Sequence, residues 1–179
     1  MDNLSKVKKI SKYFYFLFSF LLFVIPLYYI LYWVLINHLP DTLISVNHSK
    51  SLIPNELPIK LQVIGLLISL LPLSALTYVI FDVRKLFGFY REGVMFSLDH
   101  VIIFKNTAKA LLWWVLFSII YESAKSVLFT AGNPPGSRLL EVGFSSGEFT
   151  TLMVGGIVFV IAWVMDEGRI LIEENELII

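Results

Sequence analysis

The sequence predicts an all-α integral membrane protein, a bundle of four transmembrane helices with both chain termini in the cytoplasm. Residues 13–36 contain no charged side chain, and roughly 20 apolar residues can cross a bilayer as one helix. Hydrophobic residues make up 57% of the 179-residue chain and charged residues only 16%, against about 25% charged in typical soluble domains. Three more apolar segments follow the first, so we expect a single membrane domain over residues 1–179.

The first predicted span, residues 13–36, follows Lys6, Lys8, Lys9 and Lys12. A cleaved signal peptide has an apolar region of about 7–15 residues, followed by small residues at the cleavage site. The apolar region here is longer and ends without an A-x-A pattern. We therefore expect an uncleaved anchor.

The second and fourth spans are predicted at 61–81 and 149–165, which contain no charged residue. The third is harder to place, because its apolar core, 110–121, is too short to cross a bilayer alone. The span must extend backward over Lys105 and Lys109 or forward over Glu122 and Lys125. We place it forward, at 111–129.

The forward placement of span three has a consequence for the residues before it. Residues 97–109 would lie on the membrane surface as an amphipathic stretch, with Ser97 or Asp99 as the N-cap.

The distribution of lysine and arginine predicts the orientation. Four of them precede the first span and five lie in the loop 82–110, whereas segments 37–60 and 122–148 carry two each and the tail 166–179 carries one. Positively charged residues stay on the cytoplasmic side. Loop 82–110 and tail 166–179 are therefore expected in the cytoplasm, and the turn-rich loops 37–60 and 130–148 outside.

Two of these segments carry a recognisable pattern. Residues 86–97 read L-F-x-x-Y-x-x-G-x-x-F-S, and residues 166–179 follow the form E/D-x-G-x-x-L-x-E-E-x-x-L-x-I. With these motifs the chain resembles the bacterial four-span membrane family catalogued as domain of unknown function 2975. Members commonly end in Thr-Val or Thr-Ile, where this chain has Ile178 and Ile179.

The resemblance implies a multi-pass protein of the bacterial cytoplasmic (inner) membrane, but no particular activity. Genes of the family often lie beside those of small helix-turn-helix regulators, which hints at signalling.

The charges of the two motifs are complementary. Arg84, Lys85 and Arg91 place positive charge beneath the membrane, and the tail places acids at the same level. We hypothesise that the tail docks on the basic-aromatic loop 84–97 as a short strand or turn. The alternative is a solvated tail and a loop that meets anionic lipid. The remaining residues of this candidate working surface are Tyr90, Phe96, Glu167, Glu173 and Glu174.

Glu122 and Lys125 form a candidate polar pair inside the third span. Three positions apart on a helix, they can face one another and partly neutralise. An ionisable group within the membrane is costly and usually faces protein or water, which makes this pair a candidate functional site. The alternative is that the helix ends near Tyr121 and leaves both residues in the outer headgroup region.

Catalytic chemistry finds little support in the sequence. The chain has no cysteine, no metal-ligand or cofactor motif, and no nucleophile motif. Its positive residues are too few and too close to the membrane to indicate nucleic-acid binding. We therefore expect no cofactor and a non-enzymatic signalling, regulatory or accessory subunit, with the lipid bilayer and a protein partner or second copy as partners.

The competing function is a small oligomeric transporter or channel. Besides Glu122 and Lys125, its water-filled path could be lined only by Ser69, Ser74 and Ser118.

Overall fold

The computed structural model describes residues 3–39, 57–134, 136, 138 and 140–176, and within them the chain forms four long helices and no strand. The helices are α1 (Asn3–Val34), α3 (Ile59–Glu92), α4 (Leu98–Thr130) and α5 (Ser146–Glu176), and a short 3-10 helix, η1 (Ile36–His38), follows α1. Each long helix contains a stretch long and apolar enough to cross a membrane. The predicted all-α fold with four membrane helices is confirmed.

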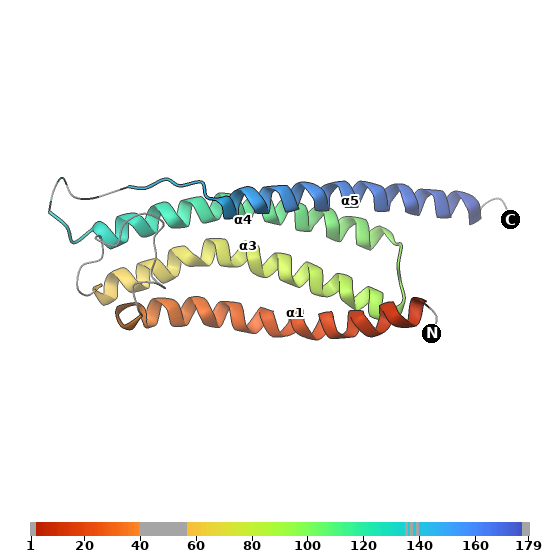
Figure 1. Ribbon diagram of the computed structural model, residues 1–179, viewed down its shortest axis with the longest axis horizontal. Helices are drawn as coiled ribbons and strands as arrows, with labels where there is room; N and C mark the ends of the chain where they lie inside the picture. Colours follow the sequence, from red (N-terminus) through yellow and green to blue (C-terminus); the bar gives the residue numbers. More distant parts are fainter. Residues whose placement is uncertain (1–2, 40–56, 135, 137, 139, 177–179) are drawn as a thin grey trace.

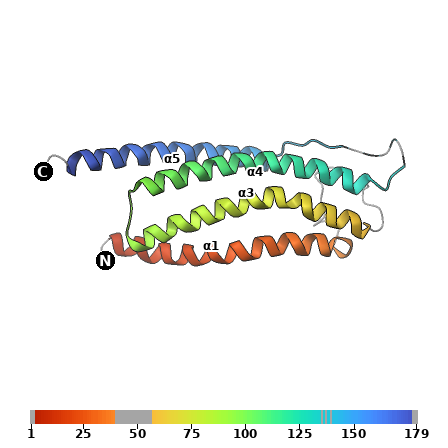
Figure 2. The same ribbon diagram turned by 180° about the vertical axis from the view of Figure 1, so that it is seen from behind.

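The four helices lie side by side in chain order, as Figures 1 and 2 show from opposite sides, and each packs mainly against the next one along the chain. The first turn of α1, the α3–α4 turn and the last turn of α5 share one end of the molecule, which we call the terminal end. The opposite end, with η1 and the last turn of α4, is the loop end. At the terminal end α5 extends past the other three helices.

The loop end contains an aromatic core in which α1 meets α4. The Trp33 side chain is only 1% exposed, and its ring centroid lies 6.5 Å from that of Tyr121 and 6.2 Å from that of Phe129. A Cβ atom added to Gly65 of α3 would lie 2.1 Å from the Trp33 indole. A glycine is therefore required here, because any side chain would overlap the buried ring.

The predicted loop 82–110 is mostly helical, which corrects the sequence prediction. Helix α3 continues to Glu92 and α4 begins at Leu98, so that only residues 93–97 connect them. Residues 97–109 do not form a separate surface-lying stretch. From Leu98 they continue into the apolar core of α4 without a break, since the helix contains no glycine or proline, and His100, Val101, Ile103, Thr107 and Ala108 are buried.

The predicted conformation of the tail is also wrong within the described residues. Residues 166–176 belong to α5 and form neither a strand nor a turn. Arg169 and Glu173, four positions apart on one helix face, are joined by hydrogen bonds of 2.7 Å, which favours the helical conformation. Leu177 and Ile179, the last motif positions, lie outside the described residues.

Candidate functional site

The first motif builds the joint between α1, α3 and α4 at the terminal end. Leu86 is buried, and Phe87 stacks on two rings of α1, with centroid distances of 4.9 Å to Phe14 and 5.6 Å to Phe18. The Tyr90 ring lies 5.1 Å from that of His100 on α4. The aromatic positions of the motif therefore act as packing contacts between helices.

The glycine and serine of the motif shape the turn itself. Gly93 has a positive φ of 91° and ends α3, with its N–H donating to Tyr90 O while the Val94 N–H donates to Phe89 O. This is the usual left-handed helix termination, and it favours glycine. Ser97 occupies the predicted N-cap position of α4, but its Oγ pairs with His100 Nδ1 at 2.7 Å and makes no capping bond.

His100 lies on the terminal side of the predicted span 111–129 and is fully buried. Burial lowers the pKa of His100, so that the neutral ring is favoured near neutral pH. A neutral imidazole suits its position beside the rings of Phe89 and Tyr90. Sequence reasoning missed this residue, since no metal or catalytic pattern surrounds it.

The basic residues of the loop, Arg84, Lys85 and Arg91, contact side chains outside the acidic tail. Arg84 donates to the Tyr15 hydroxyl at 2.6 Å and to Ser19 Oγ at 2.8 Å. The guanidinium groups of Arg84 and Arg91 both lie 4.6 Å from the centroid of the Tyr15 ring. Lys85 is exposed near the Phe89 ring of its own helix. Among the described residues, both arginines contact Tyr15 of α1, and Arg91 also lies 3.7 Å from Glu92 of its own helix. The docking of the acidic tail on these residues remains a prediction.

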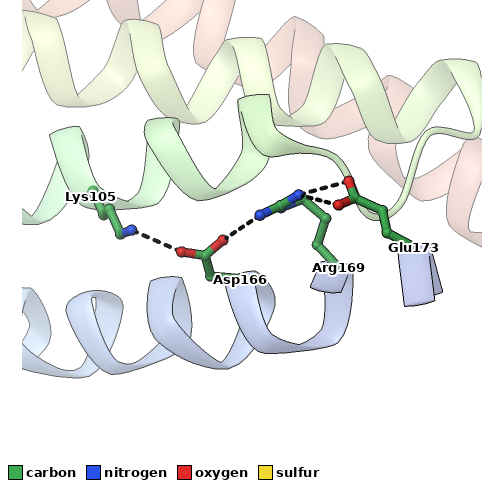
Figure 3. A network of polar contacts seen from close by, with 4 residues as sticks. All are labelled: Lys105, Asp166, Arg169 and Glu173. Atoms are coloured by element: carbon green, nitrogen blue, oxygen red, sulfur yellow. Dashed lines mark hydrogen bonds and ion pairs between the residues drawn. The ribbon is translucent and has the colours of Figure 1, made fainter. Parts of the chain in front are cut away.

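Helix α5 is instead tied to α4 by a network of charges (Figure 3). Lys105 Nζ donates to Asp166 Oδ2 at 3.1 Å, and Arg169 donates to Asp166 Oδ1 at 3.2 Å and to Glu173 at 2.7 Å. Asp166 lies just beyond the predicted span 149–165, and hydrogen bonds from Lys105 and Arg169 hold its carboxyl pKa below its usual value. The carboxylate is therefore charged at neutral pH and links the two cations.

The two motifs do meet, but through an apolar contact. A Cβ atom placed on Gly168 would lie 3.9 Å from ring carbon Cε1 of Phe96. Phe96 nevertheless remains 54% exposed. Phe96 and Gly168 thus bring the α3–α4 turn and the end of α5 together at the terminal end.

A second face of α5 points away from this network. Glu167, Ile170, Leu171 and Glu174 follow the i, i+3, i+4, i+7 spacing of one helix face, and all four are exposed. We call these four residues the α5 stripe. Glu173, the other acid of the predicted working surface, is held by Arg169, although its side chain remains 60% exposed.

Glu122 and Lys125 do form a pair. Lys125 Nζ lies 2.7 Å from the Glu122 carboxylate, with side chains that are 8% and 38% exposed. Helix α4 continues to Thr130, so the alternative in which the helix ends near Tyr121 is wrong. Among the described residues, no group of three or more histidine, cysteine or acidic side chains could hold a metal ion.

Sequence reasoning missed the partners of the predicted residues rather than the residues themselves. Arg169 enters the prediction only through the orientation, and Lys105 only through the orientation and the placement of the third span. Tyr15 and Ser19 lie inside an apparently uniform apolar span. One signal was available for Lys105 and Asp166. Both flank predicted spans on the same side of the membrane, and consecutive antiparallel helices bring such flanks to one level.

No curated protein and no solved structure matches the chain. Residues 46–179 match the family described as protein of unknown function, DUF2975. This region contains both motifs, helices α3 to α5 and the whole terminal-end joint except for the α1 residues. The chain belongs to the DUF2975 family of proteins of unknown function.

Proposed function

We propose that this protein is a non-enzymatic signalling, regulatory or accessory subunit that acts through protein contacts in the bacterial cytoplasmic membrane. The lysine and arginine counts support a cytoplasmic position for the terminal end. The proposed working surface is the α5 stripe with the neighbouring Phe96. Arg84 and Arg91 are not part of this surface, because both contact Tyr15 of α1.

One observation carries this proposal: α5 remains helical past its predicted span and beyond the ends of the other helices (Figures 1 and 2), with an exposed face that mixes acids and large apolar residues. Ile170 and Leu171 of the α5 stripe are 38% and 52% exposed. The acids disfavour contact with an anionic leaflet, and the apolar side chains disfavour water. A protein partner with apolar and basic side chains would satisfy both, as in recognition of a helix face.

The test is purification of the full chain in a gentle detergent, followed by mass spectrometry of co-eluting proteins. Glu167→Lys and Glu174→Lys should each release the partner, because they reverse a charge on the α5 stripe and leave the Lys105–Asp166 contact intact. Glu92→Lys is the matched control, since Glu92 is an exposed acid at the same end. Retention of the partner in the stripe variants, or loss of it in all three variants, would contradict the proposal.

A second candidate function, a small oligomeric transporter, is favoured by the buried Lys125 paired with Glu122 inside the predicted span 111–129. Two of its predicted lining residues are otherwise engaged, since the hydroxyls of Ser69 and Ser74 donate to carbonyls of their own helix at 2.7 Å. Solute flux in reconstituted vesicles that disappears on Glu122→Gln would support it. Vesicles without flux would exclude it for the solutes tested.

A further inference from the structure

We infer that the face of α3 between α1 and α4 binds one anionic phospholipid from the leaflet at the terminal end. Its phosphate would be held by Lys109, Asn106 and Tyr78, and its two acyl chains would lie in two grooves separated by a ridge on α3. The inference rests on the shape, polarity and depth of these grooves, and it is independent of the α5 stripe.

The first groove lies between α3 and α4 and has a volume of about 580 Å³. Most of its wall is apolar, and Trp113 at its edge is 55% exposed. Its polar side chains include Asn106 and Lys109 on α4 and Ser74 and Tyr78 on α3. A groove with a long apolar wall and a cationic end fits an amphipathic molecule better than a solvated ion.

The second groove has a volume of about 520 Å³ and lies on the other side of the same ridge, between α1 and α3. Ser74 and Tyr78 line both grooves. The remaining lining is largely aliphatic and aromatic, with Leu22 contributed by α1. Two parallel apolar grooves on one face, divided by a single ridge, match the two chains of a diacyl lipid.

The polar end of the first groove lies at the depth of a lipid headgroup. Lys109 comes two residues before the predicted span 111–129, and Asn106 lies one helical turn further toward the terminal end. Lys109 is exposed and makes no ion pair with any residue that the structure describes. Basic pockets between membrane helices at this level bind anionic headgroups, and the Asn106 amide and the Tyr78 hydroxyl can add hydrogen bonds.

The charge of the lysine selects among the possible occupants. A second copy of the chain covering this face would bury Lys109 unless it supplied an acid, and an unpaired buried charge is costly. A zwitterionic lipid would place its own cation beside the ammonium. A lipid with a net negative headgroup satisfies the lysine and fills both grooves.

The test uses the full chain, purified in mild detergent, stripped of lipid and titrated separately with phosphatidylglycerol and phosphatidylcholine of identical acyl chains. Native mass spectrometry reports the number of lipids bound and the relative affinities. We expect one phosphatidylglycerol per chain, bound more tightly than phosphatidylcholine. Lys109→Gln should weaken phosphatidylglycerol about fivefold, because one lysine near anionic lipid contributes about 1 kcal/mol.

Two further variants separate this site from general attraction to the membrane. Lys12→Gln removes an exposed lysine from α1 at the same end and should leave the affinity unchanged. Ser74→Trp adds bulk to the ridge between the grooves and should weaken binding while Lys109 remains present. Circular dichroism of each variant checks that the helices are retained.

Equal binding of the two lipids would overturn the inference, because it indicates a non-selective annular lipid. Equal effects of Lys109→Gln and Lys12→Gln would also overturn it, as would a dimer that forms without bound lipid and excludes added lipid.

Discussion

The two ends of the molecule differ in how far polar contacts add to the aromatic packing between helices. At the loop end, Trp33 of α1 is buried against Tyr121 and Phe129 of α4, and the contact consists of aromatic packing. At the terminal end, the stacking of Phe87 on two rings of α1 is joined by hydrogen bonds from Arg84 to Tyr15 and Ser19. There α5 is held to α4 through Lys105 and Asp166. The loop end should therefore resist salt and pH, whereas the terminal end should respond to both.

The largest effect is expected from removing the loop-end core. Trp33→Ala should lower the free energy of unfolding by about 3 to 5 kcal/mol, the usual range for truncation of a buried large aromatic side chain. Thermal denaturation in detergent measures it. Trp113→Ala is the matched control, since Trp113 is 55% exposed. An equal loss in both variants would mean that Trp33 is not a core residue.

Gly65→Ala should destabilise by about 1 to 3 kcal/mol, because the new methyl group would overlap the Trp33 indole and force repacking. Gly156→Ala gives the opposite expectation. Apart from the neighbouring backbone of α5, no atom of the described residues lies within 4 Å of the position that its Cβ would take. Alanine is the better residue inside a helix by about 0.5 to 1 kcal/mol. Thermal denaturation of the two variants should therefore give shifts of opposite sign. The same sign in both would contradict the close packing of α1 on α3.

Arg84→Lys separates the structural role of Arg84 from its role in orientation. The lysine keeps the positive charge but cannot reproduce the paired contacts with Tyr15 and Ser19. We expect normal membrane insertion with a loss of about 1 to 2 kcal/mol in unfolding free energy. Arg138→Lys, at an exposed arginine in the segment between α4 and α5, should have no effect. If Arg84→Lys were as stable as the native chain, the only role left for Arg84 would be to set the orientation of the chain in the membrane.

The smallest effect is expected at Asp166, whose network is open to solvent. Its pKa is lowered from the usual 3.8 by Lys105 and Arg169, so its contribution is present above that value and is lost as the pH falls through the lower folded value. Asp166→Asn should therefore lower the melting temperature slightly at pH 7. The difference from the native chain should shrink in high salt and disappear in strong acid. A difference independent of salt and pH would mean that the contact is not electrostatic.

The sequence was enough to predict the architecture. A membrane helix is indicated by a long apolar segment, and this can be recognised without knowing which other helices it packs against. Helix ends were harder to place. Polar flanks such as residues 98–109 look like surface segments until the neighbours that bury His100 and Val101 are known.

In the candidate site, too, contacts between different helices could not be predicted from the sequence. Glu122 and Lys125 were paired correctly because their contact is local on one helix. The α1 partners of Arg84 lie 65 or more positions away, and Lys105, the α4 partner of Asp166, lies 61 positions away. The sequence shows complementary charges at one level of the membrane but not the lateral order of the helices. In this chain the order places α1 beside the basic residues and α4 beside the acids.

The most direct test of the account is whether the two motifs meet at the terminal end. The chain has no cysteine, so the double variant Phe96→Cys and Gly168→Cys would carry a single reactive pair, and a short bifunctional thiol reagent can bridge it. The control pairs Phe96→Cys with Ile157→Cys, eleven residues earlier on α5 and three turns further into the membrane. We predict efficient cross-linking within one chain for positions 96 and 168 and little for the control. Absent cross-linking at 96 and 168, or equal yields for the two pairs, would contradict the placement of α5 against the α3–α4 turn.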